Sequence, residues 1–448
     1  MHLSMPKAMA AALTAAMLVM TAAVAYGTDT PTADDTAHFL AGLPPSSGSP
    51  LAALTRDPAW QQHAHNFDSI FGREDSATLS KVRAFAQAHL TDKHDTLLYF
   101  FSGPDFLYAT SLFPSASTYV LAGLEPVGDI PALTSLSRPT VDATLRNLEV
   151  SLNTLLNYSF FITKNMSVQL REGPVYGTLP VLYVFLARTG KTIHEVSLVS
   201  LDSQGNFQTA DELADADGKT RKIARRPPPS AAPGVKIVFS DGDGPKKTLY
   251  YFSTNLADGS FEHSGFEAFC SKLGVADSFI KSASYLLHSG GFAKVRSFLL
   301  DQSGAILQDD SGIPLAYFDR KKWHLQPFGR YIGPLGIFGS SYQPGMSELF
   351  SKSAIPIDFG IGYRWRKSES NLLLAEKLAA PMSEEESAPH LPAGKPSGGT
   401  VTQSPRKGRW AAGQQQARRK PVVNDGCQFA GIFSFCSTAQ TAQGRSNR

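Results

Sequence analysis

The chain has 448 residues, of which 42% are hydrophobic and 18% charged, a composition typical of a globular protein and not of a disordered chain. The formal net charge is only +3, which excludes the concentrated basic surface of a dedicated nucleic-acid-binding protein. The length suits one large domain or two of ordinary size.

The first 25 residues have the pattern of a secretory signal peptide. Lys7 precedes an Ala-, Leu- and Met-rich run, and Ala23-Val24-Ala25 has the small-residue form of a cleavage site. A retained anchor is the alternative, but the run falls short of the about 20 strongly apolar residues that a span needs. We expect cleavage after Ala25 and a secreted or periplasmic protein with no transmembrane segment in the mature chain.

Composition predicts the organisation of the remaining chain. Residues 26–50 are rich in Thr, Pro, Ser and Gly and are predicted to be a flexible leader. Residues 51–378 carry the apolar patterning of an α/β domain, interrupted over 202–234 by a polar, Pro-rich stretch that predicts a mobile insertion. Residues 379–448 form a low-complexity tail with nine Lys or Arg against four acidic residues.

The stretch from Thr96 to Gly128 organises the domain. Two short apolar runs, Leu97–Phe101 and Tyr119–Leu124, predict strands that are buried on both faces. A polar turn and a short amphipathic helix over Phe106–Phe113 connect them. Such a strand–helix–strand unit is typical of a parallel sheet.

Periodicity predicts the other elements. Helical spacing appears in 51–71, 76–90 and a long segment after Pro139, while 193–201 predicts a strand and 235–254 a hairpin. Asp277 is expected to cap a helix that continues to Leu287. A second helix follows from Phe292, then a strand over 305–308; strict alternation predicts a strand over 357–365, and 371–378 a final helix. The fold class is therefore α/β, with one large domain whose mixed, centrally buried sheet is flanked by helices, followed by a disordered C-terminal tail.

The ends of the two central strands carry the candidate ligand-binding residues, since ligands of such folds bind beyond the carboxyl ends of strands. These candidates are Ser102, Gly103, Asp105, Tyr108 and Glu125. A structural alternative is that Asp105 only caps the short helix and Glu125 only closes its strand.

A nucleotide or methyl-donor cofactor is a lesser alternative at this edge. Glu125 follows Gly103 by 22 residues, close to the spacing of the acid that binds a ribose in nucleotide-binding folds. The loop has one glycine where the fingerprint has three, and Pro104 lacks an N–H for a phosphate. We therefore predict no cofactor.

Asp309 and Asp310 are the other candidate catalytic residues. With Asp105 they could supply paired carboxylates for acid–base hydrolysis. Adjacent residues of a strand point to opposite faces, so a turn role is the alternative. The pair His63 and His65 has no supporting Cys or second His pair, and no metal site is predicted.

The three cysteines do not form a disulfide scaffold. Cys427 and Cys436 bracket a small loop in the tail and are expected to pair in an oxidising compartment, with two unpaired thiols as the alternative. Cys270 lies on an apolar pattern and is predicted to be buried.

Four blocks of the sequence resemble a family of exported bacterial proteins of unknown function. The blocks are FSGPDFLYATSLFP, YVLAGLEPVG, ILQDDSGIP and IDFGIGYRW, within residues 60–378. The resemblance implies no activity. It implies that Asp105, Glu125, Asp309 and Asp310 lie in the signature blocks of that family.

Three functional hypotheses follow. The leading one is a non-catalytic binding or envelope-associated protein, because no complete catalytic constellation is present. The alternative is a hydrolase that acts on an envelope polymer or a small ester through Asp105 with Asp309 or Asp310. A third is a structural protein whose basic tail binds anionic envelope components. The sequence identifies no ligand, substrate or oligomeric state.

Overall fold

The computed structural model describes residues 30–91, 94–158, 175–208 and 232–378. The chain divides into two compact units, Met1–Lys377 and Leu378–Arg448, and the fold described here is that of the first unit. The predicted signal peptide, the tail after residue 378 and the pair Cys427 and Cys436 lie outside the described residues.

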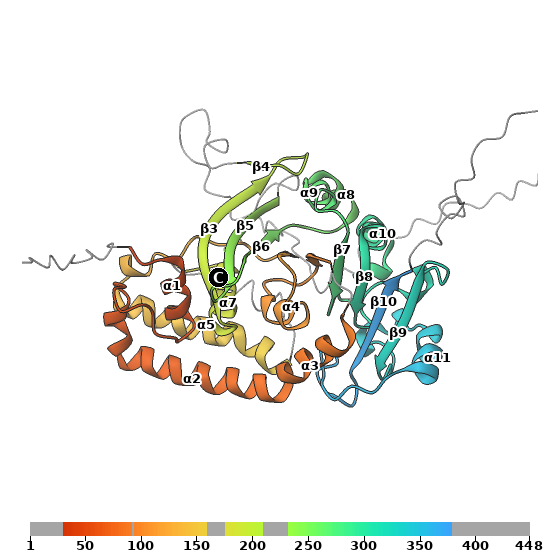
Figure 1. Cartoon of the computed structure of the whole chain (residues 1–448), viewed down its shortest axis with the longest axis horizontal. Helices are drawn as coiled ribbons and strands as arrows, with labels where there is room; N and C mark the ends of the chain where they lie inside the picture. The colour runs from red at the N-terminus through yellow and green to blue at the C-terminus, as the bar shows by residue number, and fades with distance from the viewer. Residues whose placement is uncertain (1–29, 92–93, 159–174, 209–231, 379–448) are drawn as a thin grey trace, which may run out of the picture. The chain divides into compact units, whose positions relative to one another are not determined.

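Across the described residues, ten strands form one mixed sheet in the order β4-β3-β5-β6-β2-β1-β7-β8-β10-β9 (Figure 1). Five neighbouring strands in the middle run parallel. They are β6 (Lys246–Ser253), β2 (Thr118–Gly123), β1 (Thr96–Tyr99), β7 (Ala276–Ile280) and β8 (Ser303–Gln308).

Antiparallel strands extend the sheet on both sides of this parallel centre. One side adds β5 (Ala232–Asp241), β3 (Lys191–Leu201) and the two-residue β4 (Phe207–Gln208). The other side adds β10 (Asn371–Lys377) and β9 (Trp323–Gly329).

The parallel centre has the doubly wound strand order. Numbered along the chain as 1 to 5, the strands β1, β2, β6, β7 and β8 lie in the order 3-2-1-4-5, the order of nucleotide-binding α/β sheets. The connection from β1 leads to one side and the connection from β7 to the other. The topological switch point, where such folds bind ligands, therefore lies between the carboxyl ends of β1 and β7.

Helices cover both faces of the sheet, and the alternation of side chains along β1 shows why. Leu97 and Tyr99 belong to the apolar core formed with the first helices, whereas Leu98 and Phe100 belong to the core formed with the later helices. Figure 1 shows α2, α3 and α5 on one side and α8, α9 and α10 on the other. Both faces of β1 are thus buried, as its continuous apolar run predicts.

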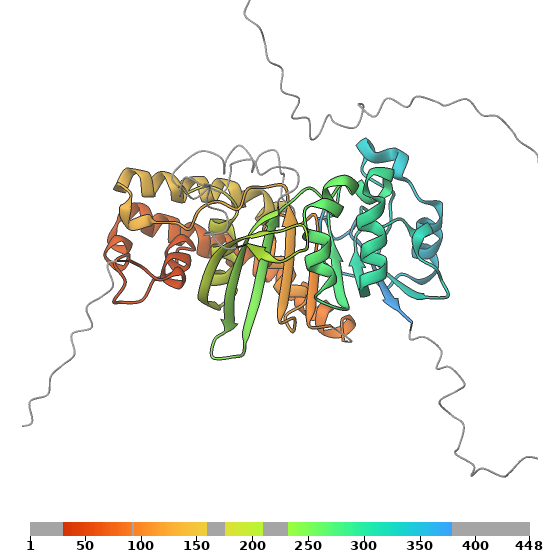
Figure 2. The same cartoon turned by 90° about the horizontal axis from the view of Figure 1, so that it is seen from above.

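Within the described ranges, the first core contains six helices: α1 (Ala33–Leu40), α2 (Pro58–Glu74), α3 (Ser80–His89), α4 (Phe106–Leu112), α5 (Arg138–Tyr158) and α7 (Leu179–Arg188). The second contains α8 (Asp258–His263), α9 (Phe266–Ser271), α10 (Ala293–Gln302) and α11 (Pro344–Ser353). Figure 2 shows the first helices at one end of this unit and α11 at the opposite end. The predicted fold class, α/β with a mixed central sheet flanked by helices, is confirmed.

The predicted flexible leader is wrong for residues 33–50. Thr32 caps α1 by accepting a hydrogen bond from the Asp35 amide, and Phe39 and Leu40 are fully buried in the first core. The polar composition hid a short amphipathic helix. The predicted insertion over 202–234 also includes β4 and the start of β5, and residues 209–231 lie outside the description.

Three segments in the second half have a different structure from the predicted one. The segment after Asp277 is strand β7 and not a helix, and 371–377 is strand β10. Residues 357–365 form bends with a single bridge between Ile361 and Arg364. Gly362 has φ +60°, which breaks an extended strand there.

Candidate functional site

The carboxyl ends of the parallel strands hold a buried polar cluster. Asp105 follows β1, Lys281 follows β7, and Asp309 and Asp310 follow β8; each is at most 3% exposed. We call these four residues the switch-point cluster. Two of the three strand ends, those of β1 and β7, flank the topological switch point.

Asp105 forms the centre of this cluster. Its Oδ1 accepts the Tyr108 amide at 3.2 Å, so it caps α4, which is the structural alternative to its predicted role in ligand binding. Its Oδ2 accepts the Tyr99 hydroxyl at 2.7 Å and the Lys281 ammonium at 2.6 Å. The same carboxylate is therefore a helix cap and one half of a buried ion pair.

Lys281 is the member of the cluster that sequence reasoning missed. Burial lowers its pKa, while Asp105, Asp309 and Glu74 raise it. Its Nζ lies 3.8 Å from the centre of the Tyr108 ring, within cation–π range. The sequence signal is a lone lysine directly after the apolar run of β7, but the spacing of that run predicts a helix.

Asp309 turns back toward β7. Its Oδ2 accepts the Ser282 amide at 2.9 Å, and its Oδ1 accepts the Ser311 amide at 3.0 Å and the Ser311 hydroxyl at 2.5 Å. Burial and the neighbouring Asp310 carboxylate together raise the pKa of Asp309 to about 6, against the three donors, which lower it.

Asp310 points to different partners from its neighbour. It accepts the Tyr285 hydroxyl at 2.7 Å, and Asn371, the first residue of β10, accepts the Asp310 amide at 2.9 Å. Burial raises its pKa, and Tyr285 and Arg364 lower it. Both carboxylates therefore bind the segment after β7, and that of Asp310 also contacts Asn371 at the start of β10.

Glu74 adds a further carboxyl from the first helical layer. It is the last residue of α2, directly before a π-helical turn over Asp75–Leu79, and it accepts the Tyr108 hydroxyl at 3.1 Å. Burial raises its pKa to about 7. Irregular turns of this kind inside helices are frequent at functional sites.

Left-handed backbone gathers on the two loops at the switch point. Among the described residues, the non-glycine residues with positive φ are Phe101, Ser282, Ser284 and Tyr285, at 52° to 61°. The first follows β1 and the other three follow β7. Each such residue costs about 1–3 kcal/mol, so the surrounding contacts hold both loops in an unfavourable conformation.

Buried polar atoms without a hydrogen-bond partner lie close to the same edge. Six such side-chain atoms occur among the described residues, and four of them are Ser282 Oγ, His288 Nε2, Arg364 Nε and Ser370 Oγ. The first two follow β7 and the last two precede β10, which pairs with β8. Unsatisfied buried groups are uncommon, and a bound water or ligand is one explanation for them.

The predicted residues on the β2 side lie apart from the ion pair. The Glu125 carboxylate is 3% exposed and lies 3.4 Å from the Tyr251 hydroxyl and next to Gly103, which has φ +56°. The Ser102 hydroxyl donates to the Gly103 carbonyl at 2.8 Å. The predicted residues therefore lie together at one edge of the sheet, but the Glu125 carboxylate already contacts groups of the protein.

The other predicted sites are structural where they are described. His63 bonds to Glu149 at 2.7 Å and to the Leu40 carbonyl at 2.9 Å, and Cys270 is a buried free thiol. Within the described ranges, no group of three or more His, Cys, Asp or Glu could hold a metal. In the same ranges no helix has the length and apolarity to span a membrane.

The strand order and the switch-point cluster define a doubly wound α/β protein with antiparallel extensions. Comparisons with protein-family models, with curated proteins and with solved structures found no match to this chain. The resemblance to exported bacterial proteins therefore stays a prediction.

Proposed function

We propose that this chain is an exported, non-catalytic binding protein whose ligand is held by the loops after β1 and β7. The single observation that carries the proposal is the placement of all four left-handed non-glycine residues of the described chain on these two loops. Backbone strain of this kind is characteristic of ligand-binding and catalytic sites. Phe101, Ser282 and Ser284 are half-buried, so the strained loops reach the surface.

The residues of the switch-point cluster hold these two loops in place. Lys281 ties the β7 loop to Asp105 on the β1 side, and Asp309 holds the Ser282 amide. Each carboxylate of the cluster already accepts two or more protein donors. Groups so engaged favour a positioning role over acid–base catalysis, which needs a carboxyl within reach of substrate.

Export is part of the proposal and rests on the signal-peptide pattern of residues 1–25. Intact mass measurement of the protein from the extracellular or periplasmic fraction tests it. The expected mature chain begins at Tyr26. Binding of the tail to anionic envelope components predicts that deletion after Leu378 releases the protein at low salt; unchanged retention contradicts that partner.

Ligand binding is tested by native mass spectrometry of the protein from the same fraction. We expect an additional bound mass that is lost when Ser282 and Ser284 are both replaced by Gly, since glycine removes the conformational constraint. Ser282→Gly alone should be more stable by about 1 kcal/mol, because the Ser282 hydroxyl has no hydrogen bond to a described residue that could be lost. Ser284→Gly should give no such gain, since it removes the bond to the Tyr363 hydroxyl at 2.5 Å. Ser203→Gly, an exposed position outside the left-handed set, is the matched control. If the double replacement changes only the stability and leaves the bound mass in place, the proposal is wrong.

Hydrolysis through carboxylates is the competing function, and the raised pKa values of Asp309 and Glu74 favour it. We expect no turnover of nitrophenyl esters or of cell-wall fragments above the buffer rate. If the wild type hydrolyses any of them and a folded Asp309→Asn variant does not, the non-catalytic assignment is wrong.

A nucleoside-type ligand at the β1–β2 edge is a second candidate, favoured by the 3-2-1-4-5 strand order and by Glu125 beside Gly103. Asp105 caps α4 where a phosphate would approach, so a phosphate should weaken binding. Calorimetry with adenosine, S-adenosylmethionine and AMP tests this candidate. AMP should bind most weakly of the three, and Glu125→Gln should weaken the binding of adenosine and of S-adenosylmethionine. If none of the three compounds gives a heat of binding, this candidate is wrong.

A further inference from the structure

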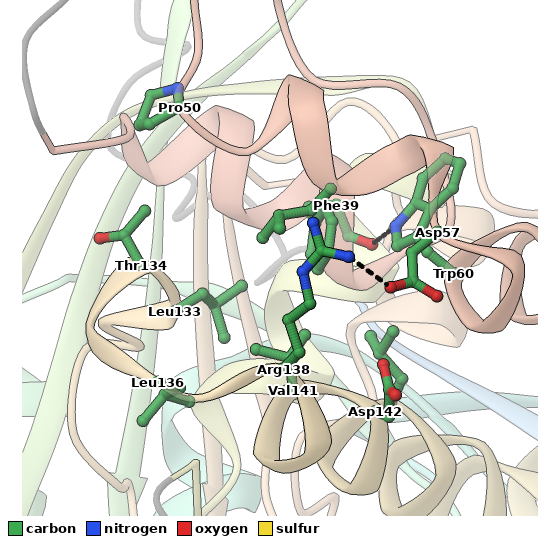
Figure 3. Close-up of a pocket in the computed structure, with 12 residues that line it drawn as sticks. Phe39, Pro50, Asp57, Trp60, Leu133, Thr134, Leu136, Arg138, Val141 and Asp142 are labelled. Carbon is green, nitrogen blue, oxygen red and sulfur yellow. Dashed lines mark hydrogen bonds and ion pairs between the residues drawn. The ribbon is translucent and has the colours of Figure 1, made fainter.

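A cleft of about 270 Å³ opens in the helical layer, away from the switch-point cluster (Figure 3). One wall comes from α1, the turn after it and the start of α2. The other comes from the segment before α5 and the first turns of α5. The cleft is smaller than the pockets that hold drug-sized ligands.

Apolar side chains line most of the cleft. Trp60 stacks on Phe39 with ring centroids 5.8 Å apart, and its indole N–H donates to the Phe39 carbonyl at 3.0 Å. This bond fixes the larger ring, so the aromatic wall is already in place before a ligand binds. The apolar lining residues are Phe39, Pro50, Leu54, Trp60, Leu133, Leu136, Val141 and Leu145.

The polar lining has an excess of negative charge. Asp57 caps α2 by accepting the Ala59 amide at 3.0 Å, and its second oxygen pairs with Arg138 at 3.2 Å. Figure 3 shows Arg138 reaching from α5 across to Asp57. Asp142, one turn along α5, is half-buried, and its carboxylate forms no ion pair or hydrogen bond with any other described residue.

We propose that this cleft binds a small organic cation with an aromatic or aliphatic body. The body packs on Phe39 and Trp60, and the ammonium lies against Asp142 and the shared carboxylate of Asp57. The only guanidinium of the lining is already paired, so a carboxylate ligand would meet two acidic side chains for each basic one. The aromatic wall adds attraction for a cation that lies near a ring face.

This site is independent of the proposed function, because its residues belong to other elements than the loops after β1 and β7. Isothermal titration with 2-phenylethylammonium, with 3-phenylpropionate and with neutral 2-phenylethanol separates charge from shape. We expect the ammonium to bind most tightly and the carboxylate most weakly. Asp142→Asn should weaken the ammonium about three- to fivefold, the size of a partly exposed ion pair, and leave the alcohol unchanged.

Two further variants complete the test. Leu136→Trp should abolish binding of the ammonium and of the alcohol by filling the cleft, while Asp243→Asn, the same charge change on the exposed β5–β6 turn, should alter neither. Thermal melting verifies that each variant is folded. Any of three outcomes overturns the proposal: tighter binding of the carboxylate, unchanged ammonium binding in Asp142→Asn, or no ammonium binding by the folded wild type at millimolar concentration.

Discussion

The switch-point cluster and the cleft beside α5 show opposite ways of placing polar groups inside one protein. In the cluster, four charged side chains are almost completely buried, and each finds protein partners within 3.5 Å. In the cleft, apolar side chains enclose about 270 Å³ of space, and the charges stay at the partly exposed edge.

The difference follows from the cost of removing a charge from water. A buried charge is tolerated only when partners surround it closely, which leaves a dense region that can position loops. An apolar wall has no such requirement and can remain hollow. Loss of a partner in the switch-point cluster should therefore lower the stability of the protein strongly, whereas loss of a side chain that lines the cleft should lower it only slightly.

The largest effect is expected from Lys281→Met. Removing the ammonium leaves the Asp105 carboxylate buried without its cation, which should lower the free energy of unfolding by about 3–5 kcal/mol. Adding Asp105→Asn should restore much of that loss. Urea unfolding of both single variants and the double variant gives the coupling energy between the two residues.

The matched control is Lys352→Met, which removes the exposed ion pair with Glu348 on α11. Its cost should be at most about 0.5 kcal/mol. A similarly small cost for Lys281→Met would show that the switch-point cluster is not buried in solution.

A pH effect of intermediate size is expected from Glu74. Its pKa is about 7 in the folded protein against an ordinary value of 4.5, so the folded state holds this proton more tightly than the unfolded state. The contribution of Glu74 to the free energy of unfolding is fully present below pH 4.5 and is lost as the pH rises through 7. The loss is about 3 kcal/mol.

Glu74→Gln keeps an acceptor for the Tyr108 hydroxyl and cannot ionise. Its stability between pH 4.5 and 8 should therefore fall less than that of the wild type, and at pH 8 the variant should be the more stable. Asp309 titrates in the same range, so some slope remains. Parallel stability curves for the two proteins would contradict the burial of Glu74.

The smallest effect is expected at the cleft. Leu136 is a half-buried lining residue, and Leu136→Ala only widens a space that is already open, so it should cost about 1 kcal/mol or less. Leu121 is completely buried in β2, and Leu121→Ala should cost about 2–5 kcal/mol. Thermal unfolding of both variants measures the contrast, and equal costs would mean that the cleft is closed in solution.

The sequence predicted the centre of the fold correctly because local pattern and tertiary environment agree there. β1, α4 and β2 follow the expected boundaries closely, since both strands are buried on both faces and Asp105 caps α4. The β5–β6 hairpin was also correctly predicted, from two apolar runs around a Gly-rich turn.

The prediction failed where long-range contacts override local spacing. Phe279, Ala283 and Leu287 have helical spacing, yet Phe279 lies in β7, paired between β1 and β8. Because the segment was predicted to be a helix, neither the buried position of Lys281 nor its ion pair with Asp105 was predicted. The alternation over 357–365 reflects bends, in which Gly360 and Gly362 approach other backbone and side-chain atoms closely.

The pairing of β1 with β7 sets the order in which this chain can fold. The Lys281 bond to Asp105 joins residues 176 positions apart, and the bond between His94 and Asp277 joins residues 183 apart. Contacts of such high sequence separation slow folding. Until residue 281 is available, β1 lacks one neighbour and Asp105 lacks its cation. The centre of the sheet can therefore be completed only after residue 281 has been synthesised.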